Sequence, residues 1–171
     1  MKMRDEVVAA DEAAVRALVA ATRMFHDDEV DVAAELVRER LTKGDESGYH
    51  FLMADTEDGS LAGYACFGPI PCTRSSWDLY WIAVDPGLQG QGLGRALLEA
   101  SEGRVAALGG TRVYVDTSGR SDYEPTRAFY ERCGYAVGAH LRDFYDVGDG
   151  KVIFEKVLNS PLVPDRSNVA S

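Results

Sequence analysis

The chain carries, at residues 84–95, the segment Val84-Asp85-Pro86-Gly87-Leu88-Gln89-Gly90-Gln91-Gly92-Leu93-Gly94-Arg95. A β-strand pattern ends at its first residue, and a helical pattern of apolar residues begins near Leu93. Glycines at alternate positions let the backbone approach a ligand closely. The helix that follows presents free N–H groups and the positive end of its dipole. The segment therefore predicts an anion site, best suited to a phosphate or pyrophosphate.

Known phosphate-binding patterns narrow the choice of ligand. The P-loop pattern GxxxxGK[ST] does not occur in the chain. The dinucleotide fingerprint GxGxxG is broken by the glycine spacing, and Asp116, an acidic residue farther along the chain, is weak support for it. A plain glycine turn is the remaining alternative, but a turn needs neither Gln89 nor Arg95. The Arg95 guanidinium can add a forked contact to phosphate oxygens.

Hydrophobic spacing on either side of this segment predicts a mixed α/β chain. Helices are expected at residues 11–25, 30–41, 93–108 and 125–132. Strands are expected at residues 49–56, 61–67, 78–84, 112–117, 135–145 and 151–157, with a short, poor candidate at 6–9. Asp11 is expected to cap the first helix, and Asp58-Gly59 predicts a hairpin. This order predicts a single domain over residues 1–158 and a loose tail over residues 159–171.

Composition and charge exclude several classes of protein. The chain has 171 residues, of which 46% are hydrophobic and 27% charged. These values are ordinary for a globular domain and exclude a collagen, a low-complexity chain and a small disulfide-stapled protein. Eighteen Lys and Arg residues against 28 Asp and Glu residues leave a net charge of −10. No nucleic-acid partner is expected, because an acidic chain gains nothing from counterion release, whereas cations such as amines are attracted.

Cysteine usage and the apolar pattern favour a cytoplasmic location. Cys66, Cys72 and Cys133 form no CxxC pair and no Cys/His cluster with zinc spacing, so no metal is expected. The chain starts in acidic sequence and has no run of 18 apolar residues. Neither a signal peptide nor a membrane interaction is therefore expected.

Two motifs resemble the GNAT N-acetyltransferase superfamily. The first is Gln89-x-x-Gly92-x-Gly94, preceded by Val84-Asp85-Pro86 and followed by Arg95-Ala96-Leu97-Leu98. The second lies about thirty residues later and is Thr126-Arg127-Ala128-Phe129-Tyr130-Glu131-Arg132-Cys133-Gly134-Tyr135. Both motifs occur in the family's order, and the resemblance covers roughly residues 5–158. It implies an α/β fold with a central, mostly antiparallel sheet flanked by helices, splayed beside the glycine segment, with acetyl-CoA held in the split.

The resemblance implies how the chain holds its cosubstrate, acetyl-CoA. Backbone groups of Ile82 and Val84 would pair with the pantetheine arm. The groups that would hold the pyrophosphate are the backbone N–H groups of Gln89, Gly90, Gln91, Gly92, Leu93 and Gly94, together with the side chain of Arg95.

The resemblance also implies direct transfer in a ternary complex. Tyr130 matches the tyrosine that protonates the leaving thiolate, which suits a phenol of pKa near 10 and a thiol of pKa near 8.5. The Val84 N–H would act as an oxyanion donor to the thioester carbonyl. Asp78 is the first candidate for the base that deprotonates the amine, and strand alternation places it on one face with Tyr80, Ile82 and Val84. Glu124 is the second candidate, and ordered water is the third.

The loop before the second motif departs from the family pattern. The family often carries an asparagine there, whereas the corresponding place in this chain is near Tyr123. Polar residues close to it are Ser118, Ser121 and Asp122. The sequence does not closely resemble the pattern of the ribosomal-protein N-terminal acetyltransferases. Cys133 could suggest an acyl-cysteine, but no histidine is adjacent in the sequence to activate it.

Features that bear on the acceptor are fewer. The cluster Asp27-Asp28-Glu29-x-Asp31 could recruit a cationic amine or could be a solvated loop. Aromatic residues that could wall an acceptor cleft are Trp77, Tyr80, Trp81 and Tyr123.

The sequence thus predicts transfer of an acetyl group from acetyl-CoA to a primary amine of a small cationic metabolite. Two alternatives are an acetyltransferase acting on protein lysines or N-termini and a non-catalytic acyl-CoA sensor. The sensor needs the glycine segment but neither a base nor an acceptor cleft. The resemblance also makes a homodimer an expectation, although no apolar stripe marks an interface.

Overall fold

A computed structural model describes residues 1–158 of the chain. Its centre is a seven-stranded sheet in the order β1-β2-β3-β4-β5-β7-β6. The strands are β1 (Lys2–Arg4), β2 (His50–Asp55), β3 (Leu61–Pro69), β4 (Ser76–Val84), β5 (Arg112–Ser118), β6 (Ala136–Asp146) and β7 (Asp149–Val157). All neighbouring pairs are antiparallel except β4 and β5, which confirms the predicted mixed, mostly antiparallel α/β fold.

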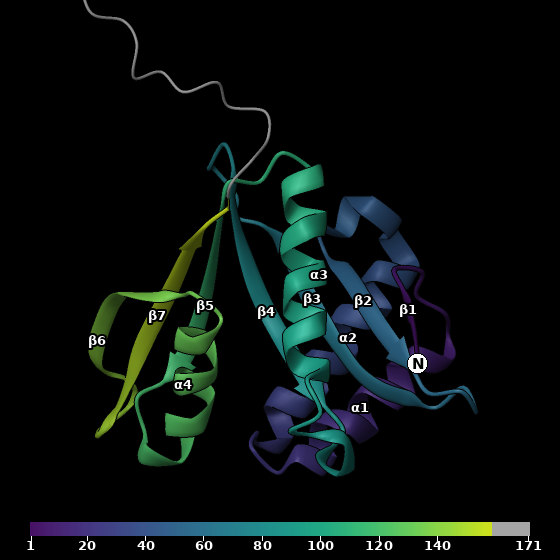
Figure 1. The fold of residues 1–171 in the computed structure, drawn as a ribbon, viewed down its shortest axis with the longest axis horizontal. Coiled ribbons are helices and arrows are strands. Elements are labelled where there is room, and N and C mark those ends of the chain that lie inside the picture. Colours follow the sequence, from purple (N-terminus) through teal and green to yellow (C-terminus); the bar gives the residue numbers. More distant parts are fainter. Residues whose placement is uncertain (159–171) are drawn as a thin grey trace, which may run out of the picture.

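Helices cover both faces of the sheet (Figure 1). They are α1 (Ala10–Thr22), α2 (Asp27–Lys43), α3 (Leu93–Ala107) and α4 (Glu124–Arg132), with short 3-10 turns at η1 (Gly44–Ser47), η2 (Pro86–Leu88) and η3 (Ser121–Tyr123). One apolar core lies under α3 and α4 and includes Leu97, Leu98 and Phe154. A second core lies under α1 and α2 and includes Val15 and Val19. Within residues 1–158, no helix combines the length and apolar character needed to cross a membrane.

The parallel pair β4 and β5 separates after three residues. Pairing joins Ser76 to Arg112, Trp77 to Val113 and Asp78 to Tyr114, and it ends there. Figure 1 shows the two strands meeting at their first residues and diverging toward their ends. The space between them beyond Asp78 and Tyr114, here called the gap, matches the splayed sheet that the family resemblance implies.

A β-bulge at Tyr80 changes which residues of β4 share a face. Trp81 pairs with Cys66 and Leu79 pairs with Phe67, so Tyr80 has no partner on β3. One extra residue reverses the alternation of side chains along a strand. Leu79 therefore packs in the same core as Ile82 and Val84, while Trp81 packs in the other core.

The predicted shared face of Asp78, Ile82 and Val84 is consequently wrong. Asp78 lies before the bulge and faces the side of the sheet opposite to its buried neighbour Leu79. Strict alternation fails here because it assumes an unbroken ladder between β3 and β4.

The N-terminal region differs from its prediction in two respects. The leading strand lies at Lys2–Arg4 and not at residues 6–9. The Arg4 guanidinium donates to Asp55 at 2.7 Å and to Asp11 at 2.7 Å and 2.8 Å, which fixes β1 beside β2 and joins it to α1. Asp11 lies inside α1 and does not cap it; its buried carboxylate accepts from the Val8 N–H at 2.8 Å. The predicted tail, residues 159–171, lies outside the described residues.

Candidate active site

The edge of β4 presents backbone groups to the gap. The Asp85 N–H donates to the Ala62 carbonyl of β3 at 2.8 Å. Because successive residues of a strand direct their N–H and C=O groups to opposite sides, those of Val84 and Ile82 point away from β3. β5 is not paired with β4 at this level, so the groups of Ile82 and Val84 face the gap.

The turn after β4 holds its glycines for two different reasons. Gly90 and Gly92 have φ of 75° and 87°, a region that side chains other than glycine rarely occupy. A Cβ atom at either position would meet no other atom within 4 Å, so the surface of the turn is open there. Gly94 is helical, and a Cβ at that position would lie 3.7 Å from Val84 Cγ2, which is an ordinary contact. The positive φ angles therefore require glycine at positions 90 and 92. At position 94 neither the backbone conformation nor the packing within the chain requires glycine, so its lack of a side chain points to a ligand outside the chain.

The other turn residues use different parts of their structure. The Gln89 side-chain amide donates to the Val84 carbonyl at 3.3 Å and so reaches the gap. Leu93 is buried in the core, which leaves only its backbone available to a ligand. The Arg95 side chain is exposed at the start of α3 and pairs with Glu99 at 2.8 Å. The Gln91 side-chain amide donates to the Gly87 carbonyl at 3.5 Å.

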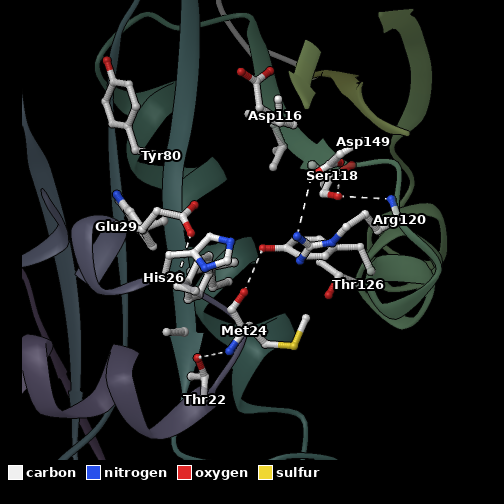
Figure 2. A pocket seen from close by; sticks show the side chains of 18 of the residues that line it. Thr22, Met24, His26, Glu29, Tyr80, Asp116, Ser118, Arg120, Thr126 and Asp149 are labelled. Carbon is white, nitrogen blue, oxygen red and sulfur yellow. Dashed lines mark hydrogen bonds and ion pairs between the residues drawn. The ribbon is translucent and has the colours of Figure 1, made fainter. Parts of the chain in front are cut away.

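A cleft of 810 Å³ lies in the gap (Figure 2). Its walls come from the junction of α1 and α2 (residues 22–29), β4 (79–84), the region from β5 to α4 (115–130) and the tip of the β6–β7 hairpin (145–149). Among the predicted site residues, the cleft brings together Ile82, Val84, Gln89 and Tyr130. Its volume is in the range of pockets that bind small molecules.

Tyr130 projects from α4 and lines this cleft. Its ring packs against Phe129, Tyr135 and Phe154, and only 3% of the residue is exposed. Burial raises the pKa of the Tyr130 hydroxyl, and nearby Cys133 and Tyr123 raise it further. The raised pKa keeps the Tyr130 hydroxyl protonated at neutral pH, and the side chain lines the cleft.

Asp78 lies at the closed end of the gap and does not line the cleft. Burial raises the pKa of its carboxyl group to about 6, and the charge of Asp116 adds to this shift. The positive charge of Lys151, which forms an ion pair with Asp116 at 2.6 Å, acts in the opposite direction and lowers the pKa of Asp78. Asp78 thus has a pKa close to neutrality, which is a common property of acid–base groups. Glu124, the second candidate, starts α4 and does not line the cleft.

The acidic cluster belongs to a helix rather than to a loop. α2 begins at Asp27, so the acidic residues occupy its first turn, where carboxylates are favourable. Glu29 Oε2 accepts from the His26 N–H at 2.8 Å and closes the capping arrangement. Asp28 and Glu29 line the cleft, whereas Asp27 and Asp31 do not.

The four predicted aromatic residues divide between core and cleft. Trp77 is buried in the core under α3. Tyr80, Trp81 and Tyr123 line the cleft. Trp81 also packs against Phe25, with ring centroids 4.8 Å apart, and so joins β4 to the junction of α1 and α2.

Sequence reasoning missed the contribution of the β6–β7 hairpin. β7 begins at Asp149, two residues before the predicted strand, and the buried Asp149 carboxylate accepts from Ser118 Oγ at 2.6 Å. The Gly119 N–H donates to the Gly150 carbonyl at 2.6 Å, which holds the two segments together. Arg120, between them and α4, also lines the cleft. The only sequence signal was the turn Gly148-Asp149-Gly150, which does not indicate where the turn lies in the fold.

Comparison with known proteins gives a consistent result. The family model described as the acetyltransferase (GNAT) family matches residues 13–135. A crystal structure of a GNAT-family protein from Desulfovibrio desulfuricans is 47% identical, covers 92% of this chain and 98% of that chain, and has a TM-score of 0.90. An aminoglycoside 6'-N-acetyltransferase complexed with coenzyme A has the same fold, at 18% identity and a TM-score of 0.74 over 96% of this chain and 98% of that chain.

Curated proteins add a relative with a defined substrate. The [ribosomal protein bS18]-alanine N-acetyltransferase of Escherichia coli is 31% identical over 96 residues, which are 56% of this chain and 62% of that protein. The alignment therefore spans less than two thirds of that protein's length. The sequence predicts no close resemblance to the ribosomal-protein N-terminal acetyltransferases when only the loop before α4 is considered, whereas this similarity extends over 96 residues.

Proposed function

The chain belongs to the GNAT acetyltransferase family, and we propose that it transfers an acetyl group from acetyl-CoA to a primary amine of a small cationic molecule. The observation that carries this proposal is the position of Val84. Its backbone groups face the gap, its carbonyl contacts the glycine turn through Gln89, and the cleft beside it contains the Tyr130 side chain.

The residues of the gap and the turn fit acetyl-CoA. The backbone of Ile82 and Val84 offers an unpaired strand edge, to which an amide-containing chain such as pantetheine can add. The open turn at Gly90 and Gly92 and the first N–H groups of α3 suit a pyrophosphate. The Arg95 side chain is free to exchange its exposed partner Glu99 for a phosphate oxygen.

Three groups of the chain would act on the reaction, for which acetyl-CoA supplies an activated thioester. The Val84 N–H would polarise the thioester carbonyl from the gap, an interaction worth about 2.7–4 kcal/mol in comparable sites. The Tyr130 hydroxyl, held protonated by burial, would donate its proton to the departing thiolate. Asp78, with a pKa of about 6, would accept the proton of the attacking amine through water, because it does not itself line the cleft.

The lining of the cleft favours a positively charged acceptor. Its carboxylates come from opposite walls, Asp28 and Glu29 from α2 and Asp116, Asp146 and Asp149 from the β5–β7 side. The net charge of −10 acts in the same direction, because it concentrates cations near the protein. Tyrosine and tryptophan rings in the walls suit an ammonium ion as well.

The direct experiment measures CoA thiol release from acetyl-CoA with a panel of amines. The panel comprises diamines and polyamines, diamino acids, aminoglycosides, free amino acids and lysine peptides. Release with the cationic small amines, and not with the peptides, would support the proposal. Binding of acetyl-CoA without release for any amine would support the sensor alternative instead.

An acceptor on a protein N-terminus is a second candidate, favoured by one observation. The curated relative from Escherichia coli acts on the alanine of a ribosomal protein. Peptides with a free N-terminal alanine, assayed beside the same peptides with a blocked N-terminus, distinguish this candidate from the small-amine acceptor.

A further inference from the structure

A cation of the chain itself lies inside the cleft. Figure 2 shows Arg120 on the wall that carries Ser118 and Asp149, with His26 and Glu29 on the facing wall. The guanidinium carbon of Arg120 is 5.4 Å from the centroid of the Tyr123 ring, a cation–π distance. One guanidinium nitrogen lies 3.6 Å from Asp149 Oδ2.

The contacts that hold this guanidinium are either long or exposed to water. The 3.6 Å separation from Asp149 is longer than a hydrogen bond. The other ion pair, with Asp122, consists of two parallel hydrogen bonds at 3.1 Å and 3.2 Å on the surface, where the Asp122 side chain is 57% exposed. Both contacts are accessible to water, which can replace the guanidinium's partners when the side chain moves.

The backbone of Arg120, in contrast, is fixed. Its N–H donates to Ser118 Oγ at 3.1 Å, and its carbonyl accepts from Arg127 at 2.8 Å. The side chain can therefore move out of the cleft while the loop between β5 and α4 keeps its position.

The surroundings of the Asp149 carboxylate favour a bound cation. The residue is 9% exposed, and Oδ1 is committed to the Ser118 hydroxyl at 2.6 Å. Oδ2 has only the distant Arg120 as a positive partner among residues 1–158. A largely buried carboxylate is costly unless a positive group compensates it, so a better-placed cation would be favoured over Arg120.

The carboxylates of the facing wall also act electrostatically on the part of the cleft around Arg120. Burial and the charge of Glu29 raise the pKa of the Tyr123 hydroxyl. Burial raises the pKa of Tyr145 to about 12, with further contributions from Asp116, Asp149 and, more weakly, Glu29. Carboxylates of both walls therefore act on two tyrosines of the cleft, Tyr145 and Tyr123, of which Tyr123 lies beside Arg120. At the other end of the cleft, the Tyr130 side chain lines the wall, although its residue as a whole is buried.

We propose that Arg120 occupies the place of the acceptor's second positive group. The acceptor is then a diamine or polyamine: one amine lies near Val84 and Tyr130, and the other displaces the guanidinium and lies between Asp149 and the Tyr123 ring. This inference rests on the proposed function, because it takes the cleft to be the acceptor site. A carboxylate on the acceptor fits less well, since it would take Arg120 from its present partners and stand among the carboxylates of both walls.

Equilibrium binding tests this proposal without the need for turnover. Calorimetry would compare 1,4-diaminobutane with n-butylamine on the full chain, on Arg120→Gln and on Asp149→Asn. We expect Arg120→Gln to tighten diamine binding by about threefold to tenfold, as for loss of a competing surface ion pair, and to leave butylamine unchanged. Asp149→Asn keeps the shape of the side chain and its bond to Ser118, and it should weaken diamine binding by about tenfold.

Arg112→Gln is the matched control. Arg112 is an exposed arginine on β5 whose side chain has one ionic partner within residues 1–158, Glu155 at 3.5 Å, and it does not line the cleft. Its removal changes the net charge equally and should leave diamine binding unchanged. Equal tightening in Arg112→Gln and Arg120→Gln, or weaker diamine binding in Arg120→Gln, would overturn the proposal.

Acetyl transfer measured in parallel separates this inference from the proposed function. Diamine binding that responds to Arg120→Gln, with no CoA release for any amine, would refute the transfer and retain the diamine site. Acetylation of butylamine, with diamine binding indifferent to Arg120→Gln and Asp149→Asn, would retain the transfer and refute the diamine site.

Discussion

Asp78 pairs with Tyr114 in the last step of the ladder between β4 and β5, and beyond this pair the two strands separate. The Asp78 carboxylate thus lies where the gap begins, on the face opposite to the core under α3. Partial burial in this position, together with Asp116, raises its pKa to about 6. The end of the β4–β5 ladder is therefore also the place where a carboxyl group with a raised pKa lies beside the gap.

The pH dependence of transfer tests Asp78 as the base. An ionised carboxylate is needed to accept a proton, so kcat/KM for the amine should rise with pH through about 6. Asp78→Asn should remove this limb and lower kcat/KM by about tenfold to a hundredfold, which leaves only the ionisation of the amine. Measurements of kcat/KM between about pH 5 and about pH 9 would show this rising part of the pH profile.

Asp116→Asn is the control for this profile. The charge of Asp116 raises the pKa of Asp78, so its removal should shift the limb to lower pH and keep its shape. A limb near pH 6 that survives in Asp78→Asn would show that Asp78 is not the base and that another group or water accepts the proton.

Asp78 should also make stability depend on pH. Its folded-state pKa of about 6 is above the ordinary value of 3.8, so the folded chain binds a proton more tightly than the unfolded chain. Stability from this group is then present below pH 3.8 and is lost as pH rises to about 6. Asp78→Asn should be more stable than the parent chain at pH 7.5 and should lose this advantage near pH 4, which thermal unfolding at the two pH values would measure. An advantage that is equal at both values would contradict the raised pKa.

Replacement of Tyr130 by Phe tests the proton donor. The variant keeps the ring that packs against Tyr135 and Phe154 and removes only the hydroxyl. We expect kcat to fall by about 10²-fold or more, with the Kd for acetyl-CoA changed by less than about threefold. Unchanged kcat would remove Tyr130 from the mechanism.

Tyr64→Phe is the matched control for loss of a tyrosine hydroxyl. Tyr64 is fully buried in the other core, and its hydroxyl has no partner among residues 1–158. Removal of a buried, unpaired hydroxyl should raise the free energy of unfolding by about 1 kcal/mol and leave kcat unchanged. Similar losses of kcat in both variants would indicate a general effect of hydroxyl removal on folding.

Much of the fold could be predicted because its signals are local. The glycine segment predicts the turn from β4 to α3, and apolar spacing predicts the helices to within a few residues. The short strand β1 could not be predicted, since it is held by the ion pairs of Arg4 with Asp11 and Asp55, which are distant in the sequence.

The sequence predicted those candidate site residues that belong to a single motif. It did not predict the features that arise from contacts between two segments distant in the sequence. Val84, Gln89 and Tyr130 belong to motifs, and the structure brings them to one cleft. The bulge at Tyr80 depends on the register with β3, and the contact of Asp149 with Ser118 depends on how the hairpin folds back. Neither the register nor this contact leaves a pattern in a single stretch of sequence.

The glycine turn allows a test in which backbone strain is separated from ligand binding. Gly92 has φ of 87°, so Gly92→Val forces a branched side chain into a region that costs about 1–2 kcal/mol and places it on the open surface of the turn. We expect binding of CoA, measured by calorimetry, to weaken by at least about a hundredfold, because the side chain would cover the N–H groups proposed to bind the pyrophosphate.

Gly59→Val is the matched control: Gly59 has φ of 85°, is equally open and lies in the β2–β3 hairpin. It should lose similar stability and bind CoA normally. Micromolar binding retained in Gly92→Val would show that the pyrophosphate lies elsewhere, whereas loss of binding in both variants would indicate that strain alone disrupts the sheet on which the gap depends.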